Sequence, residues 1–139
     1  MVVAVTAFAY PLAMAAQAGA LGLPRNDDWA YIQSAIRSAE THRLVLPDFI
    51  QAMTVGQTVM ALGVMALAGR SIVVFDVLGS MLGAVAIVSS FVLIRRVIPQ
   101  RLALVVTASI VLGPVCGSLA PTFMTDLPAM AFAYLALLA

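Results

Sequence analysis

The strongest constraint on this chain is a series of long apolar stretches that are almost free of charge. Residues 71–94 contain one acidic side chain, Asp76, whereas residues 2–22 and 102–120 contain no charged side chain. A helix needs about 20 mostly apolar residues to cross the hydrocarbon core of a bilayer. The sequence therefore predicts three membrane spans, at about 2–22, 71–94 and 102–120. A fourth is predicted at about 126–139, and the chain stops inside it.

The overall composition favours the same class. Of the 139 residues, 63% are hydrophobic and 9% are charged, whereas soluble domains carry about 25% charged residues. The net charge of +1 leaves no basic stripe, so we expect no nucleic-acid partner. One cysteine and one histidine exclude an internal disulfide framework and a Cys/His zinc site within the chain. The predicted fold is an all-α, polytopic membrane protein with about four transmembrane helices.

The segment 23–70, between the first two spans, has a different pattern. Apolar and polar residues alternate there at helical spacing over 27–43. The apolar set is Trp29, Ile32, Ile36 and Ala39, and the polar set is Gln33, Arg37, Glu40 and Arg43. This pattern predicts an amphipathic helix in the plane of the interface, followed by a second, short apolar helix over about 52–68.

The distribution of arginine indicates the orientation. If 52–68 stays at the interface, the turn with Arg95, Arg96 and Arg101 lies on the side away from the 23–70 loop. The positive-inside rule then makes that turn cytoplasmic and the loop 23–70 external. If 52–68 crosses the membrane, the three arginines are external instead. The first arrangement is the one we expect. Because the N-terminus lacks the basic residues of a signal peptide, we expect the first span to be retained.

Three acidic residues are predicted to share the external face: Asp27, Asp28 and Asp126. Each has a structural interpretation, because Asn26 is a favoured N-cap before the aspartate pair, and Thr125 or Asp126 can begin the last helix. Ionisable groups at membrane depth are costly, however, and they tend to mark functional sites. Asp76 is expected to reach back to Arg70 or to the lipid headgroups.

The order of motifs resembles the front part of the GT-C class of membrane glycosyltransferases, in the branch of the protein O-mannosyltransferases and aminoarabinose transferases. The similarity covers nearly all 139 residues. An uncharged span precedes Asp27-Asp28-x-x-Tyr31, and a short helix ends at Gly69. A span then ends in Arg95-Arg96-Val97-Ile98-Pro99, and P-T-F-M-T-D-L-P opens the last helix at 121–128. The sequence differs from many relatives at T-V-G-Q-T, residues 54–58, where those have Lys-Pro-Pro or His-Pro-Pro.

The resemblance implies transfer of a sugar from a polyprenyl-phosphate donor to a lipid, glycan or protein acceptor. The reaction would take place on the outer face of a membrane, the inner (plasma) membrane of a bacterium. By position, Asp27 and Asp28 are the expected catalytic acids, or the ligands of Mg²⁺ or Mn²⁺ if a divalent cation is used. Asp126, Tyr31 and Arg25 are the expected substrate-binding residues. Tyr31 also fits an aromatic belt at the interface. Arg37 and Arg43 are further candidates to meet the phosphate.

Two other functions remain open from the sequence. A fragment of a transporter or permease would use Asp76 more than Asp27. A non-catalytic membrane scaffold or gene remnant would use neither. For the transferase, we expect that this piece needs further spans to be active.

Overall fold

The computed structural model describes residues 1–25, 27–46 and 54–139, and within them every regular element is a helix. The prediction of an all-α fold is therefore confirmed. Asn26, expected as an N-cap, and the beginning of the predicted 52–68 helix lie outside the described residues. The helices are α1 (Val2–Gln17), α2 (Asp28–Thr41), α3 (Thr54–Ala68), α4 (Ile72–Ile94), α5 (Gln100–Val111), α6 (Pro114–Leu119) and α7 (Asp126–Leu138).

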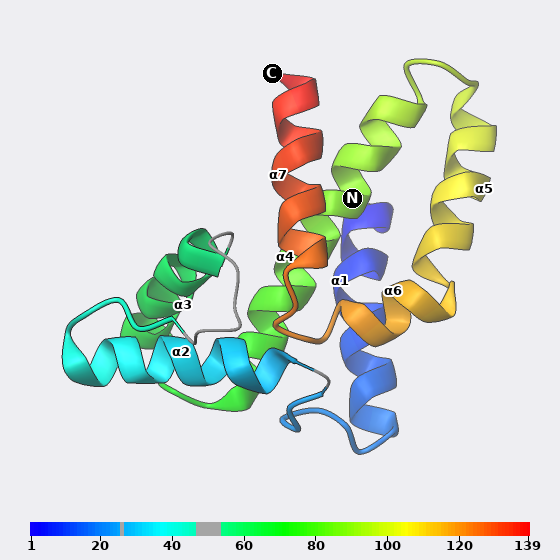
Figure 1. Cartoon of the computed structure of the whole chain (residues 1–139). Coiled ribbons are helices and arrows are strands. Elements are labelled where there is room, and N and C mark those ends of the chain that lie inside the picture. Colours follow the sequence, from blue (N-terminus) through cyan, green and yellow to red (C-terminus); the bar gives the residue numbers. More distant parts are fainter. Residues whose placement is uncertain (26, 47–53) are drawn as a thin grey trace.

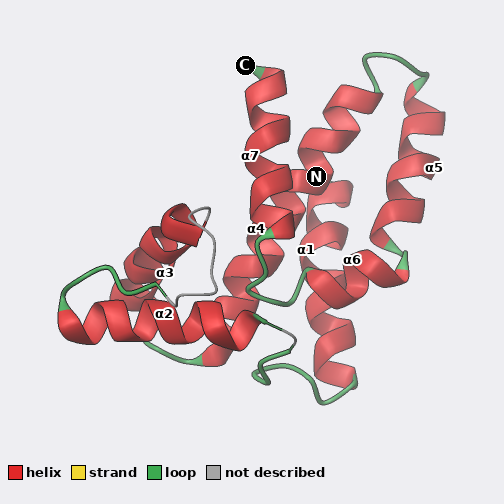
Figure 2. Cartoon of the chain, viewed as in Figure 1, coloured by secondary structure: helices red, strands yellow, loops and turns green. Residues whose placement is uncertain are grey.

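Helices α1, α4, α5 and α7 stand upright as a bundle, and α2, α3 and α6 lie at its lower half (Figure 1). Helix α4 is central and packs against α1 and α7, while α5 stands at the outer side. Helix α2 lies across the long helices, with α3 packed against it, and α6 is a short crossing piece before α7 (Figure 2). The turn between α4 and α5, which carries Arg95 and Arg96, is at the opposite end from α2 (Figure 1).

Among the described helices, α4 alone is long and apolar enough to cross a membrane by length and composition. Helices α1, α3, α5 and α7 are apolar but shorter, with 12 to 16 residues each. The predicted span at 71–94 thus has the expected length. The four-span topology remains a prediction.

Two predicted spans are shorter or divided in the structure. The stretch 102–120 breaks between α5 and α6, because Pro114 cannot donate the helical hydrogen bond and its ring clashes with the preceding turn. Pro114 instead begins a new helix, in which its missing N–H costs nothing. Helix α1 ends at Gln17 instead of residue 22, and Gly19 and Gly22 follow with positive φ angles of 66° and 80°.

The apolar face of α2 packs inside the protein. Ile32 is buried in a core cluster with residues of α3 and α4, and Ile36 and Ala39 pack against the same cluster. Trp29, which was placed on this face, is 51% exposed. The amphipathic helix predicted at 27–43 is therefore present, but most of its apolar stripe contacts protein. A second core cluster joins α1, α4 and α7 with the α5–α6 region.

Candidate functional site

The linker between α1 and α2 is held by a carboxylate from the central helix. Asp76 of α4 is fully buried, and its Oδ2 accepts a hydrogen bond of 2.7 Å from the backbone N–H of Gly22. The positive φ of Gly22 disfavours any other residue there, and a Cβ on it would lie 3.1 Å from a methyl group of Val73. The linker is thus fixed closely against the start of α4.

The position of Asp76 differs from the one expected from the sequence. Arg70 pairs with Glu40 at 3.3 Å on the surface, and Asp76 points into the protein. Asp76 also lies within electrostatic range of Arg25 and Asp28. From the sequence, Asp76 was expected to act only in the transporter alternative, on the signal of an acid inside an apolar stretch, and not beside Asp28 and Arg25. In the structure, Asp76 forms a cluster with Arg25 and Asp28 at the start of α2.

Asp28 closes the turn that leads into α2. Its Oδ1 accepts a 2.6 Å hydrogen bond from the N–H of Arg25, while the N–H of Asp28 donates to the carbonyl of Arg25 at 3.2 Å. This reciprocal pair resembles a capping box, in which a side chain reaches back to an earlier backbone N–H. Oδ2 of Asp28 is buried and has no hydrogen-bond partner among the described residues.

Burial dominates the electrostatics of Asp28. Loss of solvent raises the pKa of its carboxyl above the ordinary value of 3.8. The backbone N–H groups of Arg25, Phe123 and Trp29 and the guanidinium of Arg25 oppose this shift, because they favour the charged form. The balance leaves Asp28 easier to protonate than an exposed aspartate.

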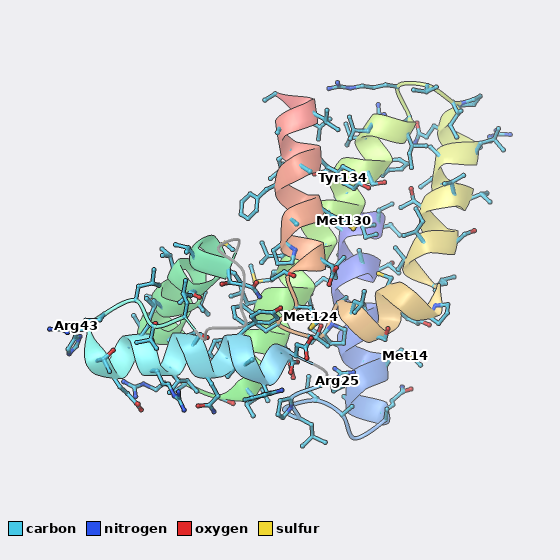
Figure 3. All side chains as sticks on the ribbon, viewed as in Figure 1. Met14, Arg25, Arg43, Met124, Met130 and Tyr134 are labelled. Carbon is cyan, nitrogen blue, oxygen red and sulfur yellow. The ribbon has the colours of Figure 1, made fainter. Side chains whose placement is uncertain are left out.

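Arg25 connects this cluster to the segment that precedes α7. Its Nη2 donates a 2.7 Å hydrogen bond to the carbonyl oxygen of Pro121, and its Nε is buried without a partner among the described residues. The side chain lies at the junction of α1, α2 and α6 (Figure 3). By contrast, Arg37 and Arg43, the other cations considered for phosphate, are exposed on α2 and just after it.

Donors from several helices hold the segment 120–124. Gln57 of α3 donates 2.6 Å and 3.4 Å hydrogen bonds to the carbonyls of Phe123 and Met124. Ser80 of α4 donates to the carbonyl of Ala120 at 3.2 Å. Gln57 occurs in the T-V-G-Q-T stretch, where many GT-C enzymes have Lys-Pro-Pro or His-Pro-Pro instead. In this structure its amide group has a structural role. Sequence spacing gave no signal for this contact.

Two glycines of α4 allow this segment to approach closely. A Cβ on Gly79 would collide with the carbonyl oxygen of Thr122, and one on Gly83 would lie 3.1 Å from Leu127. The Gly-x-x-x-Gly spacing places both glycines on one helix face, as in close helix contacts within membranes. This spacing was a usable signal in the sequence, but we predicted no helix contact from it.

The remaining predicted residues are separated from the cluster to different degrees. Asp27 is the N-cap residue of α2 and is exposed, and Tyr31 is half-buried against the core around α2 and α3. Asp126 begins α7, is exposed, and lines a separate cavity of about 310 Å³ between α5, α6 and α7. No hydrogen bond or ion pair among the described residues joins Asp126 to Asp28 or Arg25.

The described residues do not form a ready metal site. Within them, no group of three or more His, Cys, Asp or Glu side chains could hold a metal ion. The expected use of Asp27 and Asp28 as ligands of Mg²⁺ or Mn²⁺ remains a prediction, and their different exposure does not favour it, because Asp28 is turned into the protein.

Comparisons of the chain with protein-family models, with curated proteins and with solved structures find no match.

Proposed function

We propose that the chain is a GT-C-like membrane glycosyltransferase, or part of one, that transfers a sugar from a polyprenyl-phosphate donor to an acceptor at the outer face of the membrane. The observation that carries the proposal is the contact between two distant motifs. Arg25, two residues before the acidic pair, donates to Pro121, which opens the P-T-F-M-T-D-L-P stretch. The linker just before the acidic pair therefore lies against the start of the second motif, and this contact supports the proposal.

Two further features support a membrane location with several spans. Large apolar side chains are exposed along the outer helices of the bundle, for example Val5, Leu104, Ile110, Phe132 and Leu137. Such extended apolar surface marks a membrane or partner contact. At the end of the bundle opposite α2, three arginines fall within seven residues, which agrees with a cytoplasmic turn.

Within this proposal, the two aspartates of the pair have different roles. Asp27 is exposed at the start of α2 and is the carboxylate that an acceptor hydroxyl can reach. Asp28 is buried and binds the N–H of Arg25, so it positions the turn that presents Asp27. Tyr31 and Asp126 remain proposed substrate-binding residues, with Asp126 acting from the separate cavity that it lines.

The proposed reaction needs few groups from the protein. The bond between the anomeric carbon and the phosphate oxygen breaks, and a bond from the acceptor oxygen to that carbon forms. Asp27 takes the acceptor proton, and the lipid phosphate leaves with the electron pair. Because phosphate is already a good leaving group, positioning and one general base account for the protein's share of the catalysis.

The test is substitution of Asp27 by Asn in the full-length protein, with sugar transfer assayed in membranes. We expect a loss of about a hundredfold or more, the usual size of a general-base contribution. Glu40→Gln is the matched control, because Glu40 is an exposed acid of the same helix in a surface ion pair. Unchanged transfer by Asp27→Asn would remove Asp27 from the site.

A transporter or permease is the second candidate, and the burial of Asp76 in the apolar helix α4 favours it. One oxygen of Asp76 is bound by Gly22, and the other has no hydrogen-bond partner among the described residues. An acid of this kind can carry a proton through a membrane. This function predicts that Asp76→Asn abolishes proton-coupled uptake in vesicles while Asp27→Asn leaves it intact.

A further inference from the structure

A groove, here called the α1–α5 groove, runs between α1 and α5 and continues between α1 and α6 to Arg25. Two cavities form it. The upper one, of about 210 Å³, and the lower one, of about 260 Å³, share Leu112 as a lining residue. The lining residues on α1 recur every three or four positions and so lie on one face of that helix: Val3, Thr6, Tyr10 and Met14. Those on α5 and just after it follow the same spacing: Leu104, Ala108 and Leu112.

The two ends of the groove differ in chemistry. In the upper cavity, six of the eight lining residues are apolar and the other two are Thr6 and Thr107. The lower cavity is lined by Arg25, together with Tyr10 and Ser118. A long apolar channel with one cation at its end is complementary to an amphiphile with an anionic head.

The length of the groove favours a long lipid tail. From residue 3 to residue 18 the α1 side extends about 22 Å, at 1.5 Å per residue. One leaflet of hydrocarbon is about 15 Å deep, half the thickness of the bilayer core. The groove therefore offers more apolar length than an ordinary phospholipid chain fills within its leaflet, and a polyprenyl chain is longer.

The acids near Arg25 attract its guanidinium but form no direct ion pair with it among the described side chains. The carboxylates of Asp28 and Asp76 accept hydrogen bonds from the backbone N–H groups of Arg25 and Gly22. The ion pair found among the described side chains is Arg70–Glu40 and does not involve Arg25. One donor of Arg25 is used by Pro121 and its Nε is buried, and the partly buried residue lines the lower cavity.

We infer that the α1–α5 groove holds the polyprenyl-phosphate lipid, with the phosphate against Arg25 and the tail along the Leu104–Leu112 face. This inference rests on the proposed function for the identity of the lipid. It adds the place where the lipid lies and the cation that binds it.

The test measures binding and needs no transfer. The full chain, in nanodiscs of neutral phosphatidylcholine, is titrated with a photoreactive polyprenyl phosphate, and cross-linked product is quantified. We expect saturable labelling of α1 or α5 peptides, competed by unlabelled polyprenyl phosphate. Polyprenol, inorganic phosphate and phosphatidylglycerol are expected to compete at least tenfold more weakly. Equal competition by any of these three would overturn the inference.

Two pairs of variants locate the site. Arg25→Gln should weaken binding about tenfold or more, because a charge-assisted contact is lost, while Arg70→Gln, an exposed arginine in a surface ion pair, should bind as before. Ala108→Trp fills the groove and should block labelling, while Ala133→Trp on the exposed face of α7 should not. If Arg25→Gln fails to fold, as judged by thermal unfolding, the Ala108 pair decides.

Failure of this inference differs from failure of the proposed function. Lipid binding that depends on Arg25 and Ala108, without any sugar transfer by the full-length protein, would retain the groove and reject the transferase. Sugar transfer that is unaffected by Ala108→Trp and Arg25→Gln would retain the transferase and reject the groove.

Discussion

Nη2 of Arg25 donates a 2.7 Å hydrogen bond to the carbonyl oxygen of Pro121, a residue 96 positions later in the chain. The bond connects the α1–α2 linker to the segment before α7. The donor is charged and the pair is partly buried. Removal of the guanidinium would therefore leave the Pro121 carbonyl without this partner, beside a newly emptied space.

Arg25→Met keeps an unbranched apolar stem and removes the guanidinium donor. We expect a loss of about 1.5–3 kcal/mol in the free energy of unfolding, the range for hydrogen bonds to charged groups. Thermal or denaturant unfolding in detergent measures it, with Arg43→Met, on the surface beyond α2, as the control. Equal stability of the two variants would show that the bond contributes little.

Gly79 is expected to tolerate no side chain. Gly79→Ala places a methyl group against the carbonyl oxygen of Thr122, so backbone must move, at a cost of about 1–3 kcal/mol or more. Gly63→Ala is the matched change, because a Cβ there meets nothing within 4 Å and alanine favours a helix by about 1 kcal/mol. The melting temperature should therefore fall for Gly79→Ala and hold or rise for Gly63→Ala.

Substitutions of Gln57 test the role of its amide group. Gln57→Leu removes the donor to Phe123 and should cost about 1–3 kcal/mol, because the buried carbonyl loses its partner. Gln57→Glu should cost more, since a buried carboxylate would face the carbonyls of Phe123 and Met124. The order of unfolding midpoints, wild type above Leu above Glu, checks this. A Glu variant as stable as wild type would contradict it.

Asp28 gives the stability a pH dependence of defined sign. Its folded-state pKa is raised above 3.8, so the folded state holds its proton to higher pH than the unfolded state. Stability from this group is then greatest below pH 3.8 and falls as the pH rises through the folded pKa. Two charged side chains, those of Arg25 and Asp76, lie within electrostatic range of the Asp28 carboxyl. The free energy of unfolding of the wild type and of Asp28→Asn is measured at several pH values. Above pH 3.8, the Asn variant should gain stability relative to the wild type as the pH rises. A difference that does not change with pH would refute the prediction.

The orientation of the chain can be tested with two exposed arginines at opposite ends. In a Cys116→Ala background, Arg43→Cys should react with a membrane-impermeant maleimide from outside intact cells, whereas Arg101→Cys should react only after lysis. Reaction of both from the same side would reject the proposed topology and the transferase with it.

The sequence was most informative where a pattern is long. Helices α2, α3 and α4 lie within or near the predicted 27–43, 52–68 and 71–94, because periodicity and apolar length act over many residues. Single residues can override the apolar pattern. They account for the division of 102–120 at Pro114 and for the early end of α1 before Gly19. For such residues the backbone geometry decides.

The cluster around Arg25 was only partly predictable. The sequence shows that Arg25 lies beside the acidic pair. The contact of Arg25 with Pro121, however, depends on how distant helices pack. The same is true of Asp76, whose partner Gly22 lies 54 residues away in the chain. The clear difference in exposure between Asp27 and Asp28 also arises from packing, because adjacent residues at a helix start point in different directions.

The glycine face of α4 has a mechanical consequence. Because the backbone of Gly79 lies against the carbonyl of Thr122 with no side chain between them, sliding or tilting of α4 relative to the chain from Ala120 into α7 would break this contact. Neither Gly79 nor Gly83 lines the groove, so a lipid that enters beside α1 would leave this contact between α4 and α7 unchanged.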